Sequence, residues 1–302
     1  MTAFALAVIA TLLWSLNNII DKALVQRFSA GGGIPALLII SALFPILLIP
    51  TSLVQSDFSI FIPVVQIILL LLSGVCQIAW IWPYLVALRE ADVTVVMPLM
   101  AFAPVFSWIF GMLFLGEFPN SSSLVACGIM VFGAFVLSFR FKEREFDGRL
   151  ILLTTSSAFL IAATNALFKA GVPEEYQYWQ GLLWQSSGTV LVGVFVMLFH
   201  RHSRLELERF LQNNATIGIG LNSVNEVITI IGNSLFSRAI LLGQIVVVQS
   251  TEAFQPVFVF LLGSALGYWL PNHIEEDLSF DVLVRKAIGI TVICIGSFLL
   301  YA

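Results

Sequence analysis

The chain has 302 residues, of which 59% are hydrophobic and only 11% are charged, and its mean hydropathy is +0.98. Soluble domains carry about 25% charged residues, so this composition excludes an ordinary soluble protein and predicts one that is solvated by lipid. The net charge of −4 and the lack of a basic tract argue against nucleic acid as a partner.

Apolar runs follow one another along the chain, each close to the roughly 20 residues that a helix needs to cross about 30 Å of hydrocarbon. In lipid the backbone must satisfy its own hydrogen bonds, so each run is expected to be a helix. We predict ten transmembrane helices at residues 3–25, 34–54, 62–88, 92–115, 121–140, 149–170, 179–199, 214–238, 242–268 and 283–301. The first lacks a positive n-region, and we expect it to be a retained helix rather than a cleaved signal.

The first predicted helix carries polar residues near its end. Trp14, Asn18 and Asp21 fall on one face, with Lys22 beside them. A charged residue at the bilayer centre costs about 2.5–3.5 kcal/mol on insertion scales, so such residues normally face a cavity or a partner. We expect Trp14 and Asn18 to contact substrate, and Asp21 and Lys22 to act at a gate. The alternative for Lys22 is a helix-end charge that extends to the membrane interface.

The third predicted helix carries Gln77, Trp80 and Trp82. An aromatic wall opposite a carboxylate would suit an organic cation, so we place all three among the candidate substrate-binding residues. The alternative for the tryptophans is an aromatic belt at the membrane interface.

A charged stretch, Arg140 to Arg149, separates two groups of five predicted helices, at residues 1–141 and 142–302. Because five is an odd number, the second group enters the membrane in the opposite sense. We therefore predict two inverted five-helix repeats, related by a pseudo-two-fold axis in the membrane plane, that pack as one transmembrane domain.

The second half repeats landmarks of the first in the same order. The matches are Asn18 and Lys22 with Asn165 and Lys169, Gln77 and Arg89 with Glu226 and Arg238, and Pro104-Val105-Phe106 with Pro256-Val257-Phe258. A repeated half in a membrane protein is a usual mark of a secondary transporter. By this correspondence we expect Asn165 to contact substrate, and Lys169 and Arg238 to act at a gate or as helix-end charges.

The eighth predicted helix is the most polar. Its polar residues share one helical face, bordered by Asn225, and they are Asn222, Glu226, Thr229, Asn233 and Ser237. We interpret Glu226 as a group that takes up a proton or faces a cationic substrate. The alternative is a structural glutamate that holds helices together.

The ninth predicted helix places Gln249 and Glu252 just before Pro256, which removes a backbone donor and is expected to kink the helix. The first half has Met100 where Glu252 stands, so the acidic charge differs between the halves. We add Gln249 and Glu252 to the candidate substrate or coupling residues.

Lysine and arginine give the orientation. All but two of the 14, Lys169 and Arg238, lie on the side of the odd-numbered loops. This bias places the odd-numbered loops in the cytoplasm and both termini outside. We expect an integral protein of a bacterial cytoplasmic membrane.

The segment from Tyr84 to Glu117, YLVALREADVTVVMPLMAFAPVFSWIFGMLFLGE, resembles the segment that marks the EamA type of the drug/metabolite transporter superfamily. In that pattern Tyr and Ala-Leu close the third helix, the fourth carries proline and then Pro-Val-Phe, and Gly-Glu ends the segment. The second half departs from it with Tyr268-Trp269 in place of Gly-Glu. The resemblance implies a ten-helix transporter of small polar metabolites or drugs, with both termini in the cytoplasm, opposite to the charge bias.

These observations predict a secondary active transporter that moves a small polar metabolite or an organic cation by alternating access, by proton coupling or exchange. The alternatives are a lipid or lipid-headgroup flippase of the same fold, or a channel. We expect no enzyme, because the predicted helices contain no histidine and no catalytic constellation. We also expect no cofactor and no metal, and a monomer or homodimer in the lipid bilayer with a small-molecule substrate.

Overall fold

The computed structural model describes residues 2–28, 33–91, 93–138, 148–213, 217–269 and 280–301. Every regular element in these residues is a helix, which confirms the all-α prediction. The boundary predicted between Arg140 and Arg149 falls largely on residues 139–147, outside the described part of the chain.

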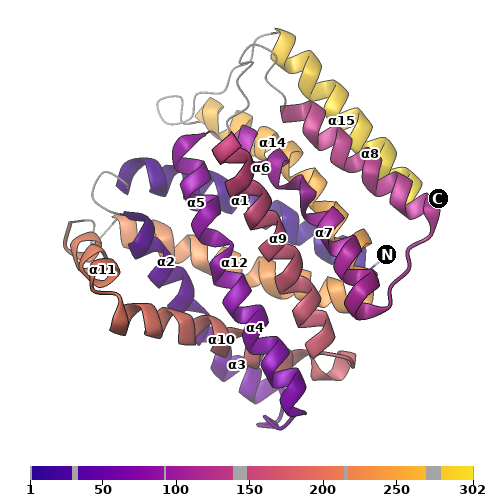
Figure 1. The fold of residues 1–302 in the computed structure, drawn as a ribbon. Coiled ribbons are helices and arrows are strands. Elements are labelled where there is room, and N and C mark those ends of the chain that lie inside the picture. Colours follow the sequence, from indigo (N-terminus) through magenta and orange to yellow (C-terminus); the bar gives the residue numbers. More distant parts are fainter. Residues whose placement is uncertain are drawn as a thin grey trace.

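Figure 1 shows the arrangement of the helices. In chain order they are α1 (Thr2–Phe28), α2 (Gly33–Leu43), η2 (Phe44–Leu47), α3 (Leu48–Gln55), α4 (Val64–Ala79), α5 (Ile81–Glu90), α6 (Val93–Leu99), η3 (Met100–Phe102), α7 (Ala103–Phe110), η4 (Gly111–Leu115), α8 (Ser121–Ser138), α9 (Gly148–Gly171), η5 (Glu175–Gln177), α10 (Tyr178–Phe199), α11 (Arg201–Asn213), α12 (Ile217–Leu242), α13 (Ile245–Ser250), η6 (Thr251–Phe254), α14 (Gln255–Trp269) and α15 (Phe280–Tyr301).

Each of the ten predicted ranges is helical over most of its described length. Six stretches are long and apolar enough to cross a membrane, and they are Thr2–Val25, Gly33–Gln55, Val64–Glu90, Gly148–Gly171, Glu175–Phe199 and Ile245–Gly263. Within the described residues α12 is not one of the six, since polar side chains recur along it. Ten crossings and an inverted relation of the halves stay predictions.

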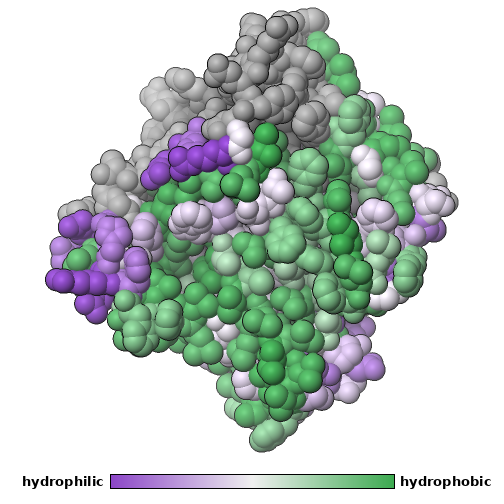
Figure 2. Space-filling view, in the orientation of Figure 1, coloured by the Kyte–Doolittle hydropathy of each residue, from purple (hydrophilic) through white to green (hydrophobic). Residues whose placement is uncertain are grey.

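The surface of the molecule is apolar, as a lipid-solvated protein requires. Large side chains such as Leu113, Phe114 and Phe195 are more than half exposed. Soluble monomers rarely expose contiguous apolar patches of this kind. Figure 2 shows hydrophobic residues over much of one face, with hydrophilic residues gathered at the left, where α11 lies. Sequence reasoning did not predict α11, because its charged sequence is not an apolar run.

Two of the predicted membrane helices are interrupted at matching places. In each, a short 3-10 turn, η3 or η6, precedes the helix that carries the proline of the Pro-Val-Phe motif. Pro104 and Pro256 cannot donate a backbone hydrogen bond to the preceding turn, so the helix tightens there. Where the sequence predicts a kink at Pro256, the structure has a short 3-10 turn, η6, which contains Glu252 and directly precedes α14.

Helix pairs from opposite halves form the body of the molecule. α1 packs along α12, α4 packs against both α9 and α10, and α8 packs along α15. The contact of α4 with α10 is a backbone-to-backbone approach, since a Cβ on Gly74 would lie 2.2 Å from the carbonyl oxygen of Gln185. Small residues commonly allow helices in membranes to approach this closely.

Replacement of Gly74 by alanine tests this contact. Alanine gains about 1 kcal/mol of helix propensity over glycine, but overpacking typically costs about 1–3 kcal/mol, and here the obstacle is backbone. We expect Gly74→Ala to lower the thermal unfolding midpoint of the purified protein. The matched variant Gly128→Ala meets nothing within 4 Å and should leave the midpoint unchanged or raise it. Equal midpoints for the two variants would contradict the close approach.

Candidate functional site

A cavity with about 1120 Å³ of empty space, part of it open to solvent, lies among the helices. Its wall is formed by α1, α2, α4, α5, α6, η3, α9, α12, η6 and α14, which belong to both halves of the sequence. The polar and charged residues of the wall are Asn17, Asn18, Asp21, Ser41, Gln77, Thr164, Asn165, Asn222, Asn225, Glu226, Thr229, Asn233, Ser237, Glu252 and Gln255.

The polar face of α12 forms one side of this wall. Its residues at the predicted helical spacing, from Asn222 through Glu226 to Ser237, all line the cavity. Ser41 of α2 donates a hydrogen bond to Oε1 of Glu226. Glu226 is only 4% exposed, so its carboxyl group is removed from lipid and reaches only the cavity.

A second carboxyl group, that of Asp21, is held by side chains from two other helices. Nδ2 of Asn225 donates to Oδ1 of Asp21 at 2.7 Å. The hydroxyl of Tyr84 lies 3.1 Å from Oδ2 of Asp21 and 2.9 Å from Oδ1 of Asn18. Hydrogen bonds to a carboxylate are roughly twice as strong as neutral ones, so this cluster fixes α1, α5 and α12 against one another.

The remaining contacts of α1 repeat this cross-helix pattern. Nε1 of Trp14 donates to Oδ1 of Asn233 at 3.0 Å, and Nδ2 of Asn17 donates to Oγ1 of Thr229 at 2.6 Å. Nδ2 of Asn18 donates to the sulfur of Met97 at 3.0 Å. The polar faces of α1 and α12 are therefore joined by hydrogen bonds along the cavity.

Several polar atoms of this region remain without a partner in the described part of the chain. They are Oδ1 of Asn17, Oδ1 of Asn225, Nδ2 of Asn222 and Nε2 of Gln249. Buried polar groups are nearly always hydrogen-bonded, to protein or to something else. The first three belong to side chains that line the cavity, although these atoms themselves are covered by protein.

The cavity wall is acidic. It contains three carboxyl groups, those of Asp21, Glu226 and Glu252, and among its described residues it has no lysine, arginine or histidine. Lys22, next to Asp21 in sequence, lies outside the wall and donates to the carbonyl oxygens of Leu88 and Ala91, each at 2.8 Å.

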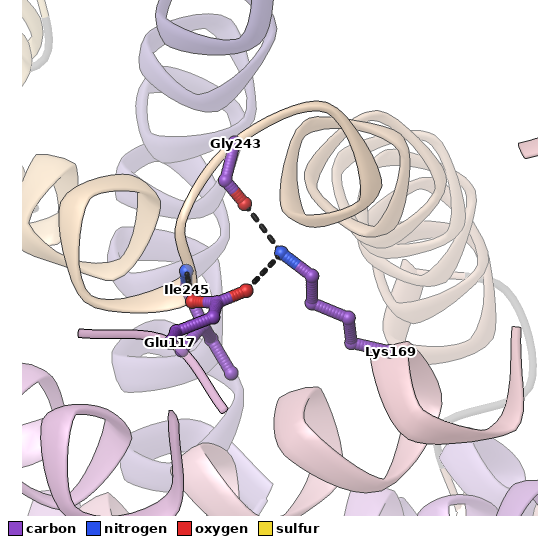
Figure 3. A network of polar contacts seen from close by, with 4 residues as sticks. All are labelled: Glu117, Lys169, Gly243 and Ile245. Carbon is purple, nitrogen blue, oxygen red and sulfur yellow. Dashed lines mark hydrogen bonds and ion pairs between the residues drawn. The ribbon is translucent and has the colours of Figure 1, made fainter. Parts of the chain in front are cut away.

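Lys169 lies one helical turn beyond the cavity residue Asn165. Its ammonium group pairs with the carboxylate of Glu117 and donates to the carbonyl of Gly243 at 2.6 Å. The same carboxylate accepts the backbone N–H of Ile245 at 2.7 Å. Figure 3 shows this four-residue network, which joins the end of η4, the end of α9 and the connection from α12 to α13.

An apolar cluster has members in both the cavity wall and this network. Its buried members are Ala7, Ala10, Ala166, Phe236, Ala239, Ile240, Ile245 and Val248. Phe236 is also part of the cavity wall, whereas the backbone of Ile245 belongs to the Glu117 network. Apolar side chains thus connect the cavity wall to the ion pair of Glu117 and Lys169.

The structure places most of the predicted site residues in the cavity wall, and they are Trp14, Asn18, Asp21, Gln77, Trp80, Asn165, Asn222, Asn225, Glu226 and Glu252. Gln249 is fully buried behind the wall, where its Oε1 accepts a hydrogen bond from Nδ2 of Asn165 at 2.7 Å. Arg238 lies outside the wall, pairs with Glu175 at 2.5 Å and stacks over the ring of Tyr178 at 5.0 Å.

Trp82 lies away from the other predicted site residues. It is 54% exposed and does not line the cavity. The physical reason is helical geometry, since residues two apart on a helix point about 200° from each other and Trp80 takes the inward direction. The alternative stated above, a tryptophan facing the membrane, agrees with this exposure.

Two further residues of the site did not stand out as candidates. Ser41 is a single hydroxyl in an otherwise apolar helix, and nothing in its pattern distinguishes it from a serine bonded to its own backbone. Glu117 stood out only as the end of the family segment. The signal that could have marked it is its place at the end of a membrane helix, opposite the otherwise isolated Lys169.

Comparison with known proteins relates the first part of the chain to a family. Residues 1–139 match the EamA-like transporter family. No curated protein matches the chain. A solved crystal structure, described only as that of a protein, has 15% sequence identity with the chain and a TM-score of 0.62, over 98% of this chain and 95% of the other. At that identity the likeness shows a shared fold alone.

The family match agrees with the apolar helices and with the segment from Tyr84 to Glu117 that carries the family pattern. Both features are those of a transmembrane transporter. The resemblance to the drug/metabolite transporter superfamily is thereby confirmed, with residues 1–139 as its EamA-like part.

Proposed function

We propose that the chain is a secondary active transporter that moves a small polar metabolite or an organic cation across the membrane by alternating access. The observation that carries this proposal is the cavity itself, a polar and acidic space enclosed by apolar helices from both halves of the chain. The match of residues 1–139 to EamA-like transporters supports a membrane transporter of this type.

Alternating access requires a framework of two related halves, and we propose ten crossings with residues 1–141 and 142–302 as inverted repeats. The contacts between helix ends support this topology. Lys22 reaches Leu88 and Ala91, and Arg149 pairs with Glu90 at 3.0 Å, so all of these ends share one side.

On the opposite side, the network of Lys169, Glu117 and Gly243 joins the ends of the fourth, sixth and eighth predicted helices. Lys22 and Lys169, which correspond in the repeat, both bind carbonyls at or just after the end of the third helix of their own half. By the lysine and arginine bias, the Lys22 side is cytoplasmic.

Within this framework we propose that Glu226 couples the movement of the substrate to the movement of protons. A carboxyl group placed midway along a membrane helix costs free energy, and such groups typically have a functional role. Among the described residues Ser41 donates a hydrogen bond to Glu226, and the carboxyl group lines the cavity, where it can exchange a proton or a cation.

Replacement of Glu226 tests this assignment. In proteoliposomes we expect Glu226→Gln to abolish uptake driven by a proton gradient, while exchange of substrate across the membrane persists. The substrate is first found by a thermal stability screen of the purified protein with amino acids, amines, sugars and nucleotides, because specific binders stabilise the folded state.

The matched control for this test is Glu208→Gln, which removes an exposed carboxylate on α11 and should leave uptake unchanged. Full gradient-driven uptake by Glu226→Gln would contradict the coupling role. Transfer of labelled lipid between leaflets, without uptake of any solute, would support the flippase alternative instead.

We further propose that the pair of Glu117 and Lys169 closes one gate of the cavity, so that it must separate when the cavity opens to that side. In a background free of native cysteines, Glu117→Gln should increase labelling of Ser237→Cys by a membrane-impermeant thiol reagent several-fold, since a neutral amide holds an ammonium group less strongly.

The control for the gate is Glu90→Gln, which breaks the pair with Arg149 at the other side of the molecule. It should not raise labelling from the Lys169 side. Equal labelling in the parent and in Glu117→Gln would show that the pair is not part of a gate.

A further inference from the structure

We propose that the solute carried in this cavity is an organic amine that has no carboxylate or phosphate group of its own. This inference rests on the proposed transport function and names the substrate class of the same cavity. Three observations support it: the acidic charge of the cavity wall, the hydrogen-bond acceptors of its side chains, and its two pairs of aromatic rings.

The first argument is charge. Asp21, Glu226 and Glu252 enter the wall from three different elements, α1, α12 and η6. The wall offers no cationic side chain among its described residues, and anionic groups are typically bound by arginine or lysine. A solute with its own carboxylate or phosphate would therefore add negative charge to an acidic space without a partner for it.

The nearest lysines do not supply that partner. The ammonium group of Lys169 is held by Glu117 and by the carbonyl of Gly243, and neither residue lines the cavity. The ammonium group of Lys22 is turned to the carbonyl oxygens of Leu88 and Ala91. An anion in the cavity would have to draw one of them away from these contacts.

The second argument is the type of hydrogen-bonding group that is left over. An ammonium group donates up to three hydrogen bonds and accepts none. The wall offers such acceptors in the carboxyl groups of Asp21, Glu226 and Glu252. Oδ1 of Asn17 and Oδ1 of Asn225 are further acceptors on cavity-lining side chains, without a partner among the described residues, and a solute reaches them when these side chains turn.

The third argument is aromatic. The wall contains two pairs of rings, Trp14 with Phe236 at 4.7 Å between centroids and Trp80 with Tyr84 at 5.4 Å. The hydroxyl of Tyr84 lies beside the carboxylate of Asp21, so ring and charge face the same part of the cavity. An ammonium group is attracted by both, and the rings also accommodate an apolar body.

Matched ligands test the proposal on the unmodified protein. Tryptamine and tryptophan differ only in the carboxylate, as do cadaverine and lysine. We expect at least one of the amines to raise the unfolding midpoint of the purified protein and to bind at least ten-fold more tightly than its amino acid. An amino acid that binds as well as its amine, or better, would overturn the proposal.

Variants of the wall identify the site of binding. Asp21→Asn and Glu226→Gln should each weaken binding of the stabilising amine at least ten-fold, whereas Glu208→Gln on α11 should leave it unchanged. Each variant is first compared with the parent by its unfolding midpoint without ligand. Unchanged affinity in both cavity variants would show that the amine binds elsewhere and would overturn the proposal.

Transport distinguishes this inference from the proposed function. Counterflow of labelled amine in proteoliposomes supports both. Counterflow of an amino acid, a sugar or a nucleotide, with none of either amine, overturns the amine class and leaves the transporter in place. If no solute of any class shows saturable counterflow, the proposed function fails and the amine inference fails with it.

Discussion

The whole arrangement depends on the free-energy cost of leaving a polar group unpaired in hydrocarbon. Backbone groups avoid this cost by forming helices, but side-chain amides and carboxyls must find partners on other helices. Asn17, Trp14 and Asp21 of α1 find theirs on α12, a segment more than 200 positions away in sequence. The side chains that surround the cavity therefore also hold the two halves of the chain together.

The two interrupted helices share the Pro-Val-Phe motif but present different side chains to the cavity. The prolines of the two Pro-Val-Phe segments each follow a short 3-10 turn, and Met100 and Glu252 occupy corresponding positions in these turns. Both residues line the cavity, one with a thioether and one with a carboxyl group. The backbone pattern is shared between the halves, while the chemistry presented to the cavity is not.

The helices and much of the cavity wall could be predicted from the sequence, because a chain in lipid must form apolar helices and place its polar side chains on an inward face. The helical ranges follow from apolar run lengths, and the polar face of α12 follows from helical spacing. The features that the sequence did not predict depend on tertiary contacts. The partner of Glu226 is a lone serine, and the partner of Lys169 is Glu117, in the connection after η4. The direction of Trp82 depends on which face of its helix is buried. The polar helix α11 was not predicted for another reason, since its charged sequence contains no apolar run.

Asp21 and Lys22 are neighbours on α1, yet they hold different parts of the molecule: the first is tied to Asn225 and the second to the backbone at the end of α5. Adjacent residues on a helix point about 100° apart, and their directions are fixed relative to each other. A rotation of α1 about its long axis would therefore change both attachments at once, the one in the cavity wall and the one at the end of α5.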